Sequence, residues 1–265
     1  MYSGPKIGIV GMGHLGTALL EGLRRAGQVP AADIRICDVD EARLEVFPDA
    51  DKAALTELAG ECGLIFVCVR PVDAPAVLDS LPGTGRVVLS AVAGMSSGSV
   101  RKACGAHVLR IMPNLAASLN EAAIAYAEPN DLTEAESAQA LAVLGMLGTV
   151  VPVSEEHFNV VTGLSGSGPA YAYVLLEGMI SGARRLGLPY EAARALAAQT
   201  LKGAGCMALA TDKSPEELIA AVATPGGTTA AGVLELEETQ TAEAAAWAVE
   251  AASQRADELS ETPGQ

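Results

Sequence analysis

Apolar residues in the first half of the chain form short continuous runs, separated by segments in which they recur every three or four positions. Continuous runs are typical of parallel strands covered on both faces, and the wider spacing is typical of helices. The expected strands are 6–10, 34–37, 64–69, 87–92, 108–112, 123–127 and 150–153, with a helix over 134–147. This alternation predicts an α/β fold with a Rossmann-type, doubly wound parallel sheet.

Beyond residue 155 the pattern changes to long Ala-rich helical stretches separated by Gly and Pro, with no further strand up to residue 261. Two expected helices, 192–210 and 242–259, carry apolar residues over most of their circumference. Such helices must be buried, and a domain of about a hundred residues has limited interior to bury them. We therefore expect two domains, 1–154 and 155–265, the second all-helical and forming an obligate homodimer.

A glycine-rich segment follows the first expected strand directly. Residues 11–16 read Gly-Met-Gly-His-Leu-Gly, and helical spacing begins at Thr17. Strand, G-x-G-x-x-G and helix in this order form the dinucleotide-binding arrangement, in which Gly11 permits the tight turn, Gly13 admits a pyrophosphate and Gly16 allows close packing. The helix N-terminus offers free N–H groups to the phosphates. The cofactor-binding residues expected here are Gly11, Met12, Gly13, His14, Leu15 and Gly16.

The second expected strand ends at Asp38. A carboxylate about twenty residues beyond the glycine loop is placed to accept a hydrogen bond from the adenosine ribose 2′-OH. The same carboxylate would repel a 2′-phosphate, so the sequence favours NADH over NADPH, although Arg43 is near enough to read that phosphate. The alternative for Asp38 is an ordinary N-cap of the next helix.

Residues at the ends of the later strands are further candidates, because ligands bind at the carboxyl ends of the strands in such sheets. The alternative for each is a simple turn residue. The candidates are Val69, Arg70, Pro71, Ala93, Gly94 and Asn114.

Charge and composition exclude several classes of partner. The net charge of −15 argues against nucleic acid and anionic membranes. No run resembles a membrane span and the N-terminus has no signal-peptide pattern, so we expect a cytoplasmic protein. The histidines are scattered and no C-x-x-C pair occurs, so no metal site is expected. The cysteines are expected to be small core residues in a reducing compartment, and they are Cys37, Cys62, Cys68, Cys104 and Cys206.

Two glycine-rich segments in the second half do not follow a packing pattern. Residues 163–171 read Gly-Leu-Ser-Gly-Ser-Gly-Pro-Ala-Tyr, and residues 223–230 read Ala-Thr-Pro-Gly-Gly-Thr-Thr-Ala. Each places small residues and a Pro before or within the first turn of an expected helix, which leaves backbone N–H groups open to an anion. The alternative is a helix–helix turn with capping threonines.

These two segments resemble the hallmark segments of the Δ1-pyrroline-5-carboxylate reductase family. The glycine loop, Val69-Arg70-Pro71, Ala93-Gly94 and Met112-Pro113-Asn114 also follow in the order that the family shows. The resemblance covers almost the whole chain. It implies NADPH- or NADH-dependent reduction of a cyclic imine carboxylate to L-proline, in proline biosynthesis, and a homodimer or larger homo-oligomer formed by an interwoven helical C-terminal domain.

The resemblance also implies roles for individual residues. The N–H groups of Gly226, Gly227 and Thr228 would hold the substrate carboxylate. The Thr229 hydroxyl would bond the ring nitrogen as the catalytic group, and Ser165 would join the substrate site. The residues themselves fit an imine substrate, because neither segment contains the Lys, His or carboxylate that a carbonyl reductase needs as proton donor. A protonated cyclic imine accepts hydride without a strong general acid.

Three alternatives differ in their fit to the sequence. A β-hydroxyacid dehydrogenase is a poor match, since the expected helix over 170–185 lacks that family's catalytic lysine. A non-catalytic dinucleotide-binding regulator is another alternative, although the retained Thr229 argues against it. A related cyclic imino acid is also open as the substrate, because the family pattern changes at Leu115, Ala116, Ile219 and Ala220.

Overall fold

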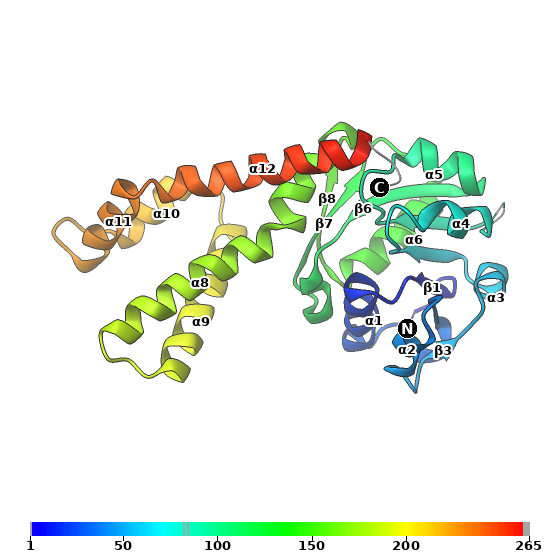
Figure 1. Ribbon diagram of the computed structural model, residues 1–265, viewed down its shortest axis with the longest axis horizontal. Coiled ribbons are helices and arrows are strands. Elements are labelled where there is room, and N and C mark those ends of the chain that lie inside the picture. The colour runs from blue at the N-terminus through cyan, green and yellow to red at the C-terminus, as the bar shows by residue number, and fades with distance from the viewer. Residues whose placement is uncertain (1, 82, 84, 262–265) are drawn as a thin grey trace. The chain divides into compact units, whose positions relative to one another are not determined.

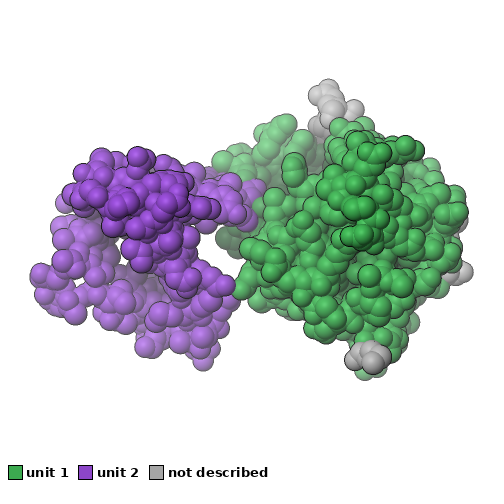
Figure 2. Space-filling model, turned by 90° about the horizontal axis from the view of Figure 1, so that it is seen from below, with its two compact units in different colours: residues 1–166, 251–265 green, residues 167–250 purple. Residues whose placement is uncertain are grey.

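The computed structural model describes residues 2–81, 83 and 85–261 (Figure 1). By its contacts the chain divides into two compact units, coloured separately in Figure 2. Unit 1 comprises residues 1–166 and 251–265, and unit 2 comprises residues 167–250. Unit 1 is therefore built from both ends of the chain. The domain boundary that we predict between residues 154 and 155 stays a prediction.

An eight-stranded, mostly parallel sheet forms the centre of unit 1, in the order β3-β2-β1-β4-β5-β6-β7-β8. The strands are β1 (Ile7–Val10), β2 (Ile34–Cys37), β3 (Asp51–Lys52), β4 (Leu64–Val67), β5 (Val87–Ser90), β6 (His107–Met112), β7 (Ala122–Ala127) and β8 (Gly148–Val153). The sheet extends from β1 in both directions, since β1 pairs in parallel with β2 on one side and β4 on the other. This reversal of strand order is the switch point at which doubly wound sheets bind ligands.

All seven strands expected from the apolar runs are present, and the predicted fold class is confirmed. Two features differ in detail from the expectation. β3 has only two residues, too few to give a pattern. β7 runs antiparallel to β6, because the connection between them contains only a short 3-10 helix, Leu115–Leu119, and a parallel crossover needs a dozen or more residues.

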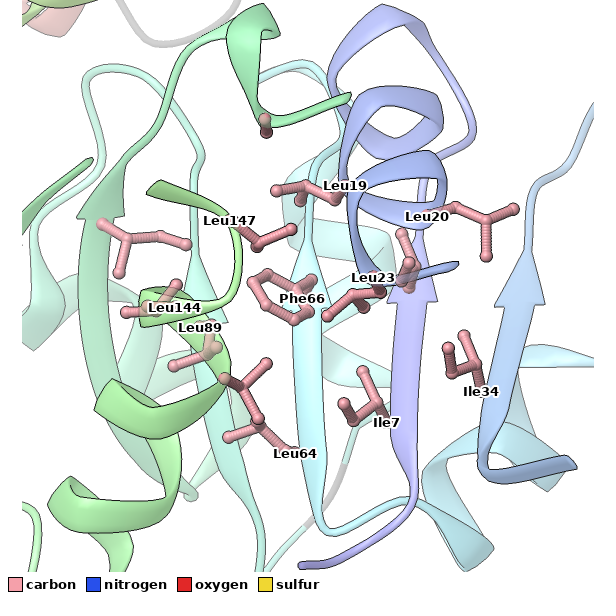
Figure 3. Packing of buried hydrophobic residues seen from close by; sticks show 14 of the residues in the cluster. Ile7, Leu19, Leu20, Leu23, Ile34, Leu64, Phe66, Leu89, Leu144 and Leu147 are labelled. Carbon is pink, nitrogen blue, oxygen red and sulfur yellow. The ribbon is translucent and has the colours of Figure 1, made fainter. Parts of the chain in front are cut away.

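Helices cover both faces of this sheet. They are α1 (His14–Ala26), α2 (Glu41–Glu45), α3 (Leu55–Glu61), α4 (Ala74–Asp79), α5 (Ser97–Cys104), α6 (Glu134–Gly145) and α7 (Phe158–Val161). Figure 3 shows Leu23 of α1 and Leu144 of α6 on the face that carries Phe66. Ile65 points to the opposite face, where it joins a second cluster with Leu58 of α3. Alternate residues of β4 thus fill two cores, which explains its unbroken apolar run.

Unit 2 contains only helices among its described residues, as predicted. These are α8 (Gly168–Arg185), α9 (Tyr190–Leu209), α10 (Pro215–Val222), α11 (Thr228–Glu238) and the first half of α12 (Thr241–Glu261). Its buried cluster is small, consisting of Ile180, Ala193 and Ala197. Large apolar side chains remain exposed instead, among them Val174, Leu196, Met207, Leu234 and Trp247.

Candidate active site

The glycine loop has the geometry that the sequence predicts. Gly11 has φ of +95°, and its N–H donates to the Cys37 carbonyl oxygen at 2.9 Å. A Cβ atom on Gly16 would lie 2.0 Å from the Gly11 carbonyl oxygen. Only glycine fits at either position, at Gly11 because of the backbone conformation and at Gly16 because of the close approach. Gly13 is the N-cap of α1, and no side chain caps that helix.

A groove of about 490 Å³ opens beside this loop. Of the predicted residues, Met12, Gly13 and His14 line it. Arg43, which the sequence places near enough to read a 2′-phosphate, lines it as well. The sequence assigned no binding role to the remaining lining residues, which are Thr17, Ala18, Glu21, Leu115 and Ser118. A Cβ atom on Gly13 would meet only Arg43 Nη1, at 3.9 Å, so the backbone at Gly13 faces open space. The groove, the bare backbone and the N-terminus of α1 together fit the pyrophosphate of a dinucleotide.

Asp38 contacts the glycine loop itself. Its Oδ2 accepts a hydrogen bond from the Met12 N–H at 2.6 Å, and its Oδ1 accepts one from the Asp40 N–H at 2.9 Å. The side chain is only 4% exposed. The carboxylate therefore stabilises the loop, which the strand-end position alone did not reveal. The N-cap of α2 is Asp40, which accepts from the Ala42 N–H, so the capping alternative for Asp38 is wrong.

The residues predicted at the ends of the later strands differ in their exposure and contacts. Val69 lies against the loop, since a Cβ atom on Gly11 would be 2.9 Å from its Cγ1. Arg70 is exposed and donates to Asp73 Oδ2 at 2.7 Å. Gly94 has φ of +73° and lies against Ser260 of α12. A Cβ atom on Gly94 would be 3.2 Å from the Ser260 Cα atom. Pro71 and Ala93 are both exposed.

Asn114 and Ser165 are brought together within unit 1. The Asn114 Nδ2 donates to the Ser165 carbonyl oxygen at 3.0 Å, while its Oδ1 accepts from the Ala116 N–H. Ser165 lies in a π-helical segment, Thr162–Gly166, and its hydroxyl donates to the Val161 carbonyl oxygen. Asn114, which we expect at the cofactor, thus binds the backbone of Ser165, which we expect at the substrate.

A partly buried ion pair connects β6 with the segment that follows β8. Arg110 of β6 is 6% exposed and donates to Glu155 Oε1 at 3.2 Å, with its guanidinium over the Phe158 ring. The same Glu155 oxygen accepts from the Ser97 N–H, at the start of α5. Burial lowers the pKa of Arg110, and the bond to Glu155 opposes that shift. Nothing in the sequence pattern indicated this network, because its members are far apart in the chain.

The Pro-Gly-Gly turn of unit 2 precedes α11 as predicted. Gly226 has φ of +73°, and the Gly227 N–H donates to the Thr224 carbonyl oxygen at 2.9 Å. Of the three N–H groups expected to hold a carboxylate, that of Gly227 is therefore used by the turn. Among the described residues, the N–H groups of Thr228 and Thr229 have no acceptor, and both side chains are exposed. The free donors are thus those of the first helical turn.

Over residues 2–81, 83 and 85–261, no group of three or more His, Cys, Asp or Glu side chains could hold a metal ion. In the same part of the chain, no helix is long and apolar enough to cross a membrane.

Known proteins resemble this chain along almost its whole length. Residues 155–259 match the family model described as pyrroline-5-carboxylate reductase dimerisation, and residues 6–94 match that described as NADP oxidoreductase, coenzyme F420-dependent. The pyrroline-5-carboxylate reductase of Methanosarcina acetivorans is 37% identical, over 96% of this chain and 97% of that protein. This chain belongs to the pyrroline-5-carboxylate reductase family.

Solved structures of pyrroline-5-carboxylate reductases agree with this assignment. The enzyme from Coxiella burnetii is 29% identical with a TM-score of 0.86, covering 97% of this chain and 99% of that one. The enzyme from Plasmodium falciparum, solved with NADP bound, has the same fold, with a TM-score of 0.87 at 24% identity over 98% and 100% of the two chains. In this chain the glycine loop lies in the matched oxidoreductase segment and the Pro-Gly-Gly turn in the matched dimerisation segment.

Proposed function

We propose that this protein reduces Δ1-pyrroline-5-carboxylate to L-proline with NAD(P)H, as a step of proline biosynthesis. The observation that carries the proposal is the groove beside the glycine loop, with Gly11 and Gly16 in positions that only glycine can occupy, in a member of the reductase family. The bound dinucleotide supplies a hydride to the imine carbon. The ring nitrogen, protonated beforehand, becomes the secondary amine of proline.

The protein's own residues would bind and orient the substrate. The free N–H groups at the start of α11, together with that of Gly226, are suited to a carboxylate because they combine unpaired donors with the positive end of the helix dipole. The Thr229 hydroxyl would accept a hydrogen bond from the protonated ring nitrogen. Ser165, held through its carbonyl oxygen by Asn114, is proposed as a further substrate-binding residue. Orientation of this kind supplies roughly 7–11 kcal/mol of a barrier in well-ordered systems, so no strong acid is required.

For the cofactor, we propose a preference for NADH over NADPH. Asp38 lies beside the groove, where a carboxylate has spare lone pairs for a ribose 2′-OH and repels a 2′-phosphate. The rest of the cofactor-binding site would be formed by the remaining predicted residues, which are Leu15, Val69, Arg70, Pro71, Ala93, Gly94 and Asn114.

For the assembly, we propose a homodimer, formed by residues 155–265 and located in the cytoplasm. Support comes from the exposed apolar side chains of unit 2, such as Val174 and Trp247, and from the match to a dimerisation model. A helical unit with so few buried residues needs a partner surface. Light scattering at micromolar concentration and moderate salt is expected to give twice the monomer mass, or a multiple of that dimer. A monomer would contradict the proposal.

The test of function is oxidation of NADH, followed by its absorbance, with a panel of cyclic imino acids. Pyrroline-5-carboxylate should be the best substrate by kcat/KM, ahead of pyrroline-2-carboxylate and the six-membered piperideine carboxylates. A higher kcat/KM with another imine of the panel would identify that related imine as the substrate. Tight dinucleotide binding without turnover of any imine would instead support the non-catalytic regulator.

A further inference from the structure

Arg43 is held by two carboxylates at the edge of the cofactor groove. Its Nη1 lies 3.5 Å from Asp38 Oδ2, and its Nε lies 3.4 Å from Asp40 Oδ2. The guanidinium remains about half exposed and lines the groove together with Gly13 and His14. The chain thus has a cation in the groove, beside the glycine loop, but that cation is already paired on two sides.

We propose that Asp40 is a specificity-determining residue, which disfavours NADPH by keeping Arg43 away from the 2′-phosphate. The proposal rests on the proposed preference for NADH and assigns that preference to a pair of carboxylates. Arg43 has the planar, five-donor group that recognises phosphate well. With both Asp38 and Asp40 present, the three side chains carry one net negative charge, and the two carboxylates compete with a 2′-phosphate for the guanidinium.

The two carboxylates differ in what else they do. Asp38 is 4% exposed and binds the N–H groups of both Met12 and Asp40, so its removal disturbs the glycine loop for either cofactor. Asp40 is 51% exposed, and its other contact is the N-cap bond from the Ala42 N–H. Asparagine caps a helix as well as aspartate does. Asp40→Asn therefore removes one of the two charges that hold Arg43 and leaves the local backbone bonds in place.

The experiment measures dissociation constants for NAD⁺ and NADP⁺ by calorimetry, without an imine substrate. Asp40→Asn should improve NADP⁺ binding relative to NAD⁺ about tenfold, the effect of one phosphate–guanidinium bond. The double variant Asp40→Asn/Arg43→Ala should lose that gain. Asp40→Ser, also a good N-cap, should repeat it, and circular dichroism verifies the fold of each variant.

Glu45→Gln is the matched control, because it removes the same charge from the same short helix outside this triad. An unchanged ratio in Asp40→Asn would overturn the proposal. So would a gain that survives without Arg43, or an equal gain in Glu45→Gln, since either would assign the effect to general charge. A wild-type preference for NADP⁺ would overturn only the proposed NADH preference. Absence of imine turnover would overturn only the proposed function. The change in the ratio of the NAD⁺ and NADP⁺ dissociation constants is measured separately from both.

Discussion

The side-chain amide of Asn114 donates a hydrogen bond to the carbonyl oxygen of Ser165, with 3.0 Å between the nitrogen and the oxygen. Asn114 follows β6 at the carboxyl edge of the sheet, whereas Ser165 belongs to the segment that follows β8 and α7. The bond therefore fixes the backbone of an expected substrate residue to the sheet that carries the cofactor groove. Its loss should affect catalysis as well as stability.

Asn114→Asp tests this bond. The aspartate keeps the acceptor for the Ala116 N–H and replaces the donor with an oxygen that repels the Ser165 carbonyl. We expect kcat/KM for pyrroline-5-carboxylate to fall about tenfold, the effect of losing one hydrogen bond and leaving its acceptor unpaired.

The matched control for this change is Asn130→Asp. Asn130 also donates to a carbonyl oxygen, that of Ala127, and accepts from the N–H two residues ahead, but it contacts no site residue. Both variants should lose about 1–2 kcal/mol of unfolding free energy in denaturant titrations. Equal losses of kcat/KM in the two would show that the Asn114 bond has no role beyond stability.

The same substitution at two glycines of this loop should affect stability at one and cofactor binding at the other. In Gly16→Ala the new Cβ atom would lie 2.0 Å from a backbone oxygen, so the loop and α1 must separate and the melting temperature should fall by several degrees or more. In Gly13→Ala the methyl group enters open space next to Arg43, so the fold should remain and KM for NADH should rise. Calorimetric melting and steady-state kinetics separate the two effects, and a stable Gly16→Ala variant with normal KM would contradict the packing argument.

Thr229 and Thr228 share the first turn of α11 but should differ in catalysis. Thr229→Val removes the hydroxyl proposed to bond the protonated nitrogen, a loss of about 1.5–3 kcal/mol, or roughly ten- to a hundredfold in kcat/KM. NADH affinity should not change. Thr229→Ser keeps the hydroxyl and should retain most of the activity.

Thr228→Val is the control, because it keeps the backbone N–H that is proposed to hold the carboxylate. It should cost much less than Thr229→Val. If the two valine variants behave alike, or Thr229→Ser is as slow as Thr229→Val, the assigned roles are wrong.

Ionisation of Cys68 should make the fold less stable at alkaline pH. Burial raises the pKa of this thiol from its ordinary value of 9.0 to about 12. Because the folded-state pKa is the higher one, the thiol's contribution to stability is complete below pH 9.0 and is lost as the pH rises from there towards 12. Between pH 8.5 and about 10.5 the unfolding free energy of the wild type should therefore fall more than that of Cys68→Ala. The control is Val69→Ala, which shortens the neighbouring side chain without removing a titrating group and should lose as much stability over this pH range as the wild type. A loss in the wild type as small as that in Cys68→Ala would refute the assignment.

Sequence patterns predict the strands well because β1, β4 and β5 are buried on both faces and so contain almost only apolar residues. The glycine loop was predictable for a similar local reason, since Gly11 and Gly16 satisfy constraints set within a few residues. Asp38 shows the limit of this approach. Its position after β2 is visible in the sequence, but its bond to Met12 depends on how two strands lie side by side.

Contacts between distant segments could not be predicted. The Glu155 carboxylate joins Arg110 to Ser97, and no single segment contains a pattern for that pairing. The turn before α11 was expected as an anion site, yet which N–H groups are free depends on the turn conformation, in which Gly227 bonds to Thr224. Spacing shows that donors are present, whereas the fold decides which of them remain available.

Because unit 1 contains both ends of the chain, its folding depends on the order of synthesis. Asn159 donates to Asp257 of α12 at 2.6 Å, and Ser260 of the same helix lies against Gly94. A ribosome makes these α12 residues only after all of unit 2 has been made. The nascent chain therefore carries an incomplete nucleotide-binding unit through much of translation, and the surface around Asn159 and Gly94 is open to chaperones and proteases until α12 has been made.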